Sequence, residues 1–186
     1  MSFTITDWIH EIAASYIKEG DLCIDGTAGK GNDTAFLCEK AGATGHVLAF
    51  DIQKEAIDAT RQYLFKLGFE KRATLIQRGH EHMDEYGKEN TVSVILFNLG
   101  YLPGGDHSLK TQAKTTIEAM EKGLSLLKNE GLMGICIYSG KDSGYEEKEA
   151  VLSWVKELPA GKFDVITTPF FNKPNDPPLP VFIRKR

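Results

Sequence analysis

The chain has few cysteines, little excess charge and no long hydrophobic segment. Its 186 residues include three cysteines, an odd number without C-x-x-C spacing, which excludes a disulfide-stapled scaffold. We expect reduced, buried thiols in a cytoplasmic protein, at Cys23, Cys38 and Cys136. No apolar segment approaches the roughly 20 residues of a membrane span, and the first residues show no export signal, so we expect no membrane partner.

The charge balance is slightly acidic, which excludes a generally basic, nucleic-acid-binding surface. Lys and Arg number 22 against 26 Asp and Glu, giving a formal net charge of -4. RNA contacts must therefore come from local patches, and we expect no DNA partner. The candidate cations lie near the start of a predicted helix and at the end of the chain: Lys110, Lys114, Arg184, Lys185 and Arg186.

Length and composition are those of an ordinary globular protein, and we expect one domain over residues 1–186. Short apolar segments predict strands at 22–24, 46–50, 73–76, 92–97, 131–138, 163–168 and 181–184. Helical spacing lies between them at 5–18, 33–41, 54–67, 111–127 and 145–157. This alternation predicts an α/β fold, a mostly parallel sheet with helices on both faces. The prolines of segment 172–180 exclude helix and interior strand there.

In such a sheet, ligands bind beyond the carboxyl ends of the strands, so the residues that follow each strand are the candidates. The first strand leads into a glycine-containing turn, Asp25-Gly-Thr-Ala-Gly-Lys-Gly-Asn-Asp-Thr34. It lacks the Gly-Lys-Ser/Thr ending of a P-loop and is a poor dinucleotide fingerprint. An acid before the glycines suits a ligand with a cationic end, such as the methionine part of S-adenosylmethionine (SAM). The candidate cofactor residues here are Asp25, Thr27, Gly29, Gly31, Asn32, Asp33 and Thr34, with helix capping the alternative for Asn32 and Asp33.

The second and third strands supply further cofactor candidates. Asp51 follows the second strand and is suited to accept hydrogen bonds from both ribose hydroxyls, with Ile52 and Gln53 beside the adenine. After the third strand, Gly79 and His80 are candidates for the adenine edge. The segment His80-Glu-His82 lacks H-E-x-x-H spacing and an apparent third ligand, so we predict no metal site.

The fourth strand ends in Asn98-Leu-Gly-Tyr-Leu-Pro-Gly-Gly-Asp-His107. A polar side chain emerges from an apolar strand and is followed by an aromatic residue and a glycine-rich turn. The arrangement resembles the [DN]-P-P-Y motif of enzymes that methylate exocyclic amines, with Leu99 and Gly100 in place of the prolines. A buried Asn in a structured turn is the alternative interpretation.

These segments are similar to those of the MnmM/YtqB-type methyltransferases, long described as rRNA methylases. The turn that starts at Asp25 resembles their D-A-T-x-G-N-G-x-D-T loop, with Gly26 and Lys30 as departures. The segment 98–106 matches N-L-G-Y-L-P-x-G-D, and Thr115-Thr116 and 175–178 match as well. The resemblance covers essentially the whole chain. It implies a class I, Rossmann-like SAM-dependent methyltransferase with a seven-stranded sheet whose last strand is antiparallel.

The resemblance also implies a bacterial enzyme that methylates the amine of 5-aminomethyl-(2-thio)uridine at the tRNA wobble position. We expect Asn98 to orient the amine, Tyr101 to pack against uracil or ribose, and Asp106 or His107 to accept a proton or bind RNA. SAM is the expected cofactor, with Asn98 and Leu99 also at its pocket. The alternatives are a SAM-dependent enzyme acting on rRNA or a small molecule, and a non-catalytic SAM-binding module. The oligomeric state stays open, with a homodimer one option.

Overall fold

The computed structural model describes residues 3–100, 111–138, 145–174 and 177–186. The helices are α1 (Ile5–Ala14), α2 (Asn32–Ala41), α3 (Lys54–Leu67), α4 (Ala113–Leu126) and α5 (Tyr145–Glu157), with a 3₁₀ helix η1 (His80–Glu85). The strands are β1 (Leu22–Asp25), β2 (His46–Phe50), β3 (Ala73–Ile76), β4 (Val92–Leu99), β5 (Leu127–Ile137), β6 (Phe163–Thr167) and β7 (Leu179–Lys185). The predicted alternation of strands and helices is confirmed, and η1 is the element that the hydrophobic pattern did not predict.

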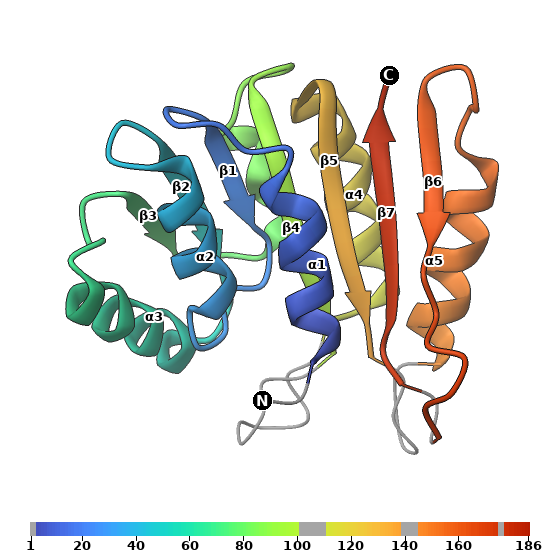
Figure 1. Ribbon diagram of the computed structural model, residues 1–186, viewed down its shortest axis with the longest axis horizontal. Helices are drawn as coiled ribbons and strands as arrows, with labels where there is room; N and C mark the ends of the chain where they lie inside the picture. Colours follow the sequence, from blue (N-terminus) through green and yellow to red (C-terminus); the bar gives the residue numbers. More distant parts are fainter. Residues whose placement is uncertain (1–2, 101–110, 139–144, 175–176) are drawn as a thin grey trace.

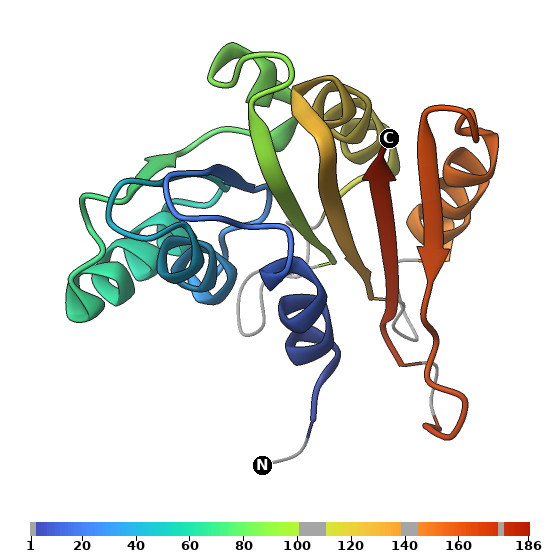
Figure 2. The same cartoon turned by 45° about the horizontal axis from the view of Figure 1, so that its top comes forward.

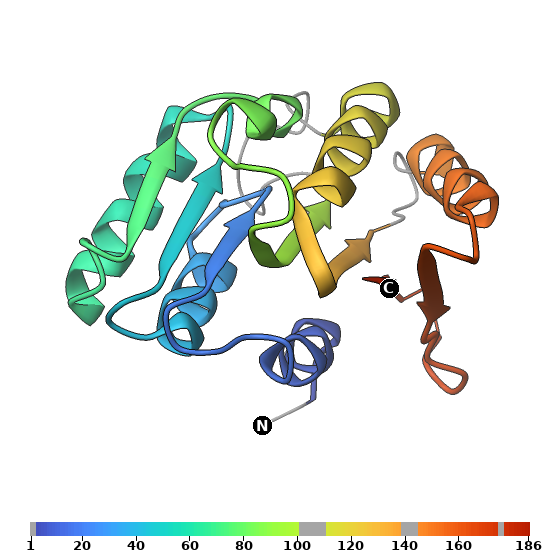
Figure 3. The same ribbon diagram turned by 90° about the horizontal axis from the view of Figure 1, so that it is seen from above.

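The strands form one sheet in the order β3-β2-β1-β4-β5-β7-β6, with β7 antiparallel to both of its neighbours (Figure 1). The expected seven-stranded, mostly parallel sheet is therefore confirmed. Helices cover both faces (Figure 3). Apolar residues of α1, α2 and α3 pack on one face, and those of α4, α5 and η1 pack on the other.

The strand order reverses between β1 and β4, the two central neighbours. Both strands are buried, because helices cover the sheet on both sides, and their sequences are correspondingly apolar. Their carboxyl ends lie at the same edge of the sheet, so the segments after Asp25 and Leu99 lie side by side. The fold thus provides a ligand site at the point where doubly wound sheets place one.

Two element boundaries differ from the sequence prediction by four residues, and the others by at most two. Helix α1 ends at Ala14, because Ser15 closes it with a turn and Gly20 has a positive φ of 90°. Strand β5 begins at Leu127 rather than at Gly131, since Leu127 already pairs with Val92 before a register shift.

The expectation that the prolines of 172–180 exclude an interior strand is wrong for Pro180, the second residue of β7. The carbonyl of Pro180 accepts a hydrogen bond from the amide of Thr168, just beyond the end of β6. In an antiparallel strand the N–H and C=O of one residue point to the same side. The missing N–H of Pro180 therefore faces the end of β6, and the ladder with β5 is kept.

The cations at the end of the chain do not lie at the carboxyl edge of the sheet. Because β7 is antiparallel, it ends at the opposite edge (Figure 1). Arg184 and Arg186 both pair with Asp164, and the Lys185 ammonium donates to the carbonyls of Leu124 and Leu127. These side chains therefore bind groups of the protein itself, and they lie away from the carboxyl edge of the sheet. Within the residues that the structure describes, none of the helices combines the length and hydrophobicity of a membrane span.

Candidate active site

The turn after β1 is shaped by glycines. Gly29 and Gly31 have positive φ angles of 52° and 84°, which a residue without Cβ adopts at little steric cost. Gly31 is the residue before the first turn of α2, and no side chain caps this helix. The alternative that Asn32 or Asp33 caps the helix is therefore wrong: both lie inside its first turn, which leaves the Asp33 carboxylate free to bond across the site.

Asp25, the last residue of β1, has a fully buried carboxylate. Its oxygens accept hydrogen bonds from the Thr27 amide at 3.0 Å and from the Thr34 hydroxyl at 2.6 Å. Burial, with the negative charge of Asp33 as the next cause, raises the pKa of Asp25 to about 7. The side chain therefore holds both ends of the turn, and a nearby cation would favour its ionised form.

Asp51 follows β2 and also binds the turn. One oxygen accepts from the Gly29 amide at 3.0 Å and the other from the Gln53 amide at 2.9 Å. A carboxylate has about four acceptor positions, so capacity remains for a diol. Beside it, the Ile52 side chain is 53% exposed, an apolar surface suited to one face of a purine.

After β3, the side chain of His80 packs inside the protein. His80 is buried, its Nδ1 lies 3.0 Å from the carbonyl oxygen of Gly26, and its ring packs edge-on against Phe97. Burial lowers the pKa of His80, so the ring is neutral near pH 7. Gly79 precedes η1 in an extended conformation. Among the described residues, no group of three or more His, Cys, Asp or Glu side chains is arranged to hold a metal ion.

Asn98, the second-last residue of β4, joins the turn after β1. Its backbone amide donates to the Thr27 hydroxyl at 2.7 Å, and its side-chain Nδ2 donates to Asp33 Oδ2 at 2.6 Å. The other oxygen of Asp33 lies 2.8 Å from Nε2 of His10, on α1. Three elements that are distant in the sequence thus converge at the carboxyl edge. The next residue, Leu99, is buried.

A second polar cluster lies just beyond β4. The Gly100 amide donates to the Thr111 hydroxyl at 2.9 Å, and that hydroxyl donates to Glu147 of α5 at 2.7 Å. The Thr116 hydroxyl donates to the other oxygen of Glu147, which is buried. The three remaining predicted catalytic residues, Tyr101, Asp106 and His107, lie outside the described residues.

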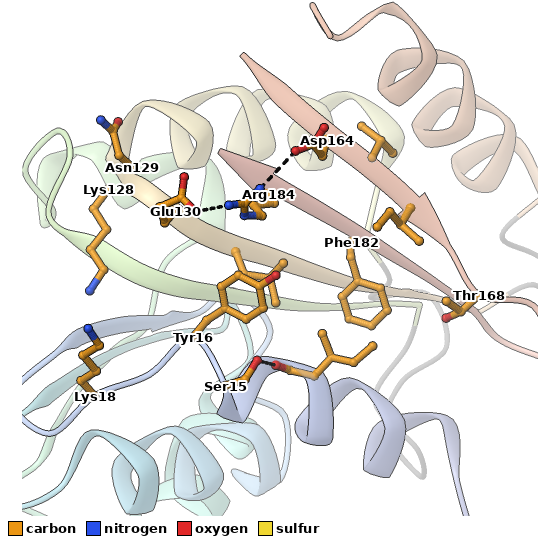
Figure 4. A pocket seen from close by; sticks show the side chains of 14 residues that line it. Ser15, Tyr16, Lys18, Lys128, Asn129, Glu130, Asp164, Thr168, Phe182 and Arg184 are labelled. Carbon is orange, nitrogen blue, oxygen red and sulfur yellow. Dashed lines mark hydrogen bonds and ion pairs between the residues drawn. The ribbon is translucent and has the colours of Figure 1, made fainter. Parts of the chain in front are cut away.

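A groove of about 1010 Å³ lies elsewhere, between α1 and strands β5, β6 and β7 (Figure 4). On this face, α1 packs against β5 and β7 (Figure 2). The groove contains none of the predicted site residues. The Arg184 side chain at its centre pairs with Glu130 and Asp164 (Figure 4). The groove is therefore separate from the site at the carboxyl edge.

Comparison with known proteins agrees with this geometry. The family model described as "Putative rRNA methylase" matches residues 47–184. The Arabidopsis thaliana protein named tRNA (mnm(5)s(2)U34)-methyltransferase, chloroplastic, is 36% identical over 97% of this chain and 69% of its own length. A Clostridium thermocellum protein described as an rRNA methylase has a TM-score of 0.96 and 44% identity, with both chains fully covered. A Streptococcus mutans methyltransferase in complex with SAH, S-adenosylhomocysteine, has a TM-score of 0.89 and 36% identity, also with full coverage.

The strand order, the glycine turn after β1 and the acid after β2 define a class I SAM-dependent methyltransferase. The chain belongs to the rRNA methylase family named above.

No local sequence signal marks His10 or Glu147 as a site residue. His10 lies on an amphipathic helix beside the buried Ile9, and nothing in its local pattern distinguishes it from a surface histidine. Glu147 lies in the first turn of α5, where an acid is expected for the helix dipole alone. Only the contacts across the fold reveal that His10 binds Asp33, which contacts Asn98, and that Glu147 binds Thr111, which contacts Gly100.

Proposed function

We propose that this methyltransferase modifies the primary amine of 5-aminomethyluridine, with or without 2-thiolation, at the wobble position of tRNA. Family membership and the fold give the coarser statement, an RNA methyltransferase with SAM as its cofactor. The proposal that the substrate is this tRNA amine is supported by the 36% identity, over nearly the whole chain, to the Arabidopsis tRNA enzyme. We further propose that the enzyme is bacterial and cytoplasmic. Its three buried thiols stay reduced in that compartment.

The chemistry of the donor set fits SAM. The carboxylate of Asp51 suits the ribose diol, and the exposed side chain of Ile52 suits the adenine face. The first amides of α2 suit the methionine carboxylate. The buried charges of Asp25 and Asp33 create a negative potential that suits the ammonium and the sulfonium. Direct contact between the ammonium and Asp25 is not required, since the carboxylate acts through this potential.

The chain's own residues prepare the amine. When bound, SAM supplies an electrophilic methyl group, whose C–S bond breaks with its electron pair going to sulfur as the amine nitrogen forms the new bond. Asn98 accepts an N–H of the neutral amine and turns its lone pair toward the methyl group. Such positioning supplies roughly 7–11 kcal/mol of a barrier. We assign packing of the base to Tyr101 and acceptance of the ammonium proton to Asp106 or His107.

Nucleoside mass spectrometry tests the proposal. Bulk tRNA from a strain without this protein is expected to accumulate 5-aminomethyl-type uridine and to lose the methylated nucleoside. Incubation of that tRNA with the purified protein and SAM is expected to restore it. Asn98→Ala is expected to retain SAH binding in calorimetry and to lose turnover, and near-normal turnover would remove Asn98 from the mechanism.

A second substrate, rRNA, is supported by the description of the matching family. The same experiment separates the two, because rRNA and tRNA from the deletion strain are incubated in parallel with labelled SAM. Methyl incorporation into rRNA alone would refute the tRNA proposal. Incorporation into neither RNA, with SAH binding intact, would favour a small-molecule substrate.

A further inference from the structure

We propose that His10 is a positioning residue that acts through Asp33 to fix the side-chain amide of Asn98, so that its oxygen faces the substrate amine. This inference rests on the proposed function, because it assigns Asn98 the role of accepting an N–H of that amine. It assigns a role in the site to α1, whereas the other site residues lie in or near the turns that follow the strands.

The side-chain amide of Asn98 is held in one orientation by Asp33. Nδ2 of Asn98 lies 2.6 Å from Oδ2 of Asp33, and an ionised carboxylate only accepts hydrogen bonds. The amide nitrogen must therefore face Asp33. The backbone of Asn98 is held by its bond to the Thr27 hydroxyl at 2.7 Å. With backbone and Nδ2 both fixed, Oδ1 is the acceptor that Asn98 presents to a ligand, since Nδ2 only donates.

The carboxylate of Asp33 is in turn held by His10. Its side chain is 7% exposed, so its carboxylate depends on protein partners rather than on water. Nε2 of His10 lies 2.8 Å from Oδ1, and because an ionised carboxylate only accepts, this hydrogen bond requires the tautomer with its proton on Nε2. The His10 ring stacks on Phe36, with ring centres 3.8 Å apart and planes 4° apart. The stacked ring thus fixes the carboxylate, and the carboxylate fixes the amide.

The orientation of the Asn98 amide decides how the substrate amine is bound. A neutral primary amine has two N–H donors and one lone pair, and the lone pair must point at the methyl carbon. An acceptor on one N–H orients the amine in this way. A rotated Asn98 amide would instead present NH₂, which donates to the lone pair and blocks attack. The orientation of one amide therefore separates a productive site from an inhibited one, and His10 selects the productive orientation.

Two variants of His10 test this chain of contacts. His10→Phe keeps a ring to stack on Phe36 but has no donor for Asp33. His10→Gln loses the ring but carries an amide N–H. The matched control is His46→Phe, since Nε2 of His46 also bonds a side chain, the Thr74 hydroxyl at 2.8 Å. His46 is the first residue of β2, so it lies at the amino edge of the sheet, opposite the site.

Two measurements are made on each variant and on the wild type. The first is the NMR signal of the Asn98 side-chain amide in the protein without RNA. The second is single-turnover methylation of tRNA from the deletion strain, with SAH affinity measured alongside. We expect His10→Phe to move the Asn98 signal and to slow methylation about 10²-fold, the effect of a small misplacement. SAH affinity should stay within twofold, and His10→Gln should recover part of the rate.

Several results would overturn the proposal. An unmoved Asn98 signal in His10→Phe would show that His10 does not hold the amide. Equal losses of methylation and of SAH affinity, or no recovery in His10→Gln, would indicate a general structural role. If the wild type methylates no tRNA, the proposed function fails, whereas the amide signal still decides whether His10 fixes Asn98.

Discussion

The buried carboxylate of Asp25 gives the sharpest prediction. Asp25→Asn replaces it with a group of the same shape that carries no charge. The amide oxygen can still accept from the Thr27 N–H, and the Thr34 hydroxyl can rotate to accept from the new NH₂. The substitution therefore removes the buried charge and keeps the hydrogen bonds of the turn.

The magnitude follows from the pKa of Asp25, about 7 in the folded protein against an ordinary value of 3.8. The folded state binds this proton more tightly than the unfolded state, so ionisation of Asp25 destabilises the fold. This destabilisation is absent below about pH 4, grows by about 1.4 kcal/mol per pH unit up to about pH 7, and is constant above. Its full size is on the order of 4 kcal/mol. Asp25→Asn should therefore be more stable than the wild type at pH 8, with the difference falling toward pH 5.

Urea unfolding at pH 5, 6, 7 and 8 measures this difference, because titrations common to both proteins cancel. The control is Asp58→Asn on α3, where Lys54 and Arg61 lower the pKa of the carboxyl. That substitution should lower stability at neutral pH, the opposite sign. Parallel pH profiles for Asp25→Asn and the wild type would refute the buried-charge argument.

The same titration predicts the pH dependence of cofactor binding. SAM carries a net positive charge through its sulfonium and favours ionised Asp25, so SAM should bind more tightly as the pH rises toward 7, and calorimetry should show proton release. In Asp25→Asn this part of the pH dependence should disappear, and affinity at pH 8 should fall. An unchanged pH profile in the variant would mean that Asp25 does not interact with the ligand's charge.

Three further predictions concern stability and thiol chemistry. Gly31→Ala should lower the free energy of unfolding by about 1–2 kcal/mol or more, since φ is 84° and the new Cβ would lie 3.0 Å from Thr60 Cα. Gly68→Ala, with φ at 71° and open space around it, is the control and should lose less. Glu147→Gln should lose about 1–3 kcal/mol in urea unfolding, because an amide cannot accept on both sides, whereas exposed Glu146→Gln should change little. Burial raises the pKa of each thiol to about 12, so iodoacetamide at pH 8 should label the protein only after unfolding, at Cys23, Cys38 and Cys136.

Much of the fold follows from local pattern. Each predicted strand is a short apolar segment, and all seven are confirmed. Burial on both faces of the sheet requires such segments in the inner strands β1, β2 and β4. The exceptions arise from tertiary pairing. Pro180 belongs to a strand because its missing N–H faces the end of β6. The 3₁₀ helix η1 is too short to show a hydrophobic period.

The candidate site is divided in the same way. The sequence by itself determined that Asp25, Asp51 and Asn98 lie at the carboxyl ends of predicted strands, and carboxyl ends of parallel strands share one edge. Only the tertiary structure decided what each carboxylate binds. Asp33 is indistinguishable from a helix cap in the sequence, and its bonds to Asn98 and His10 span 65 and 23 residues. Hydrogen bonds act over about 3 Å of space whatever the separation along the chain, so contacts of this kind leave no local periodicity to detect.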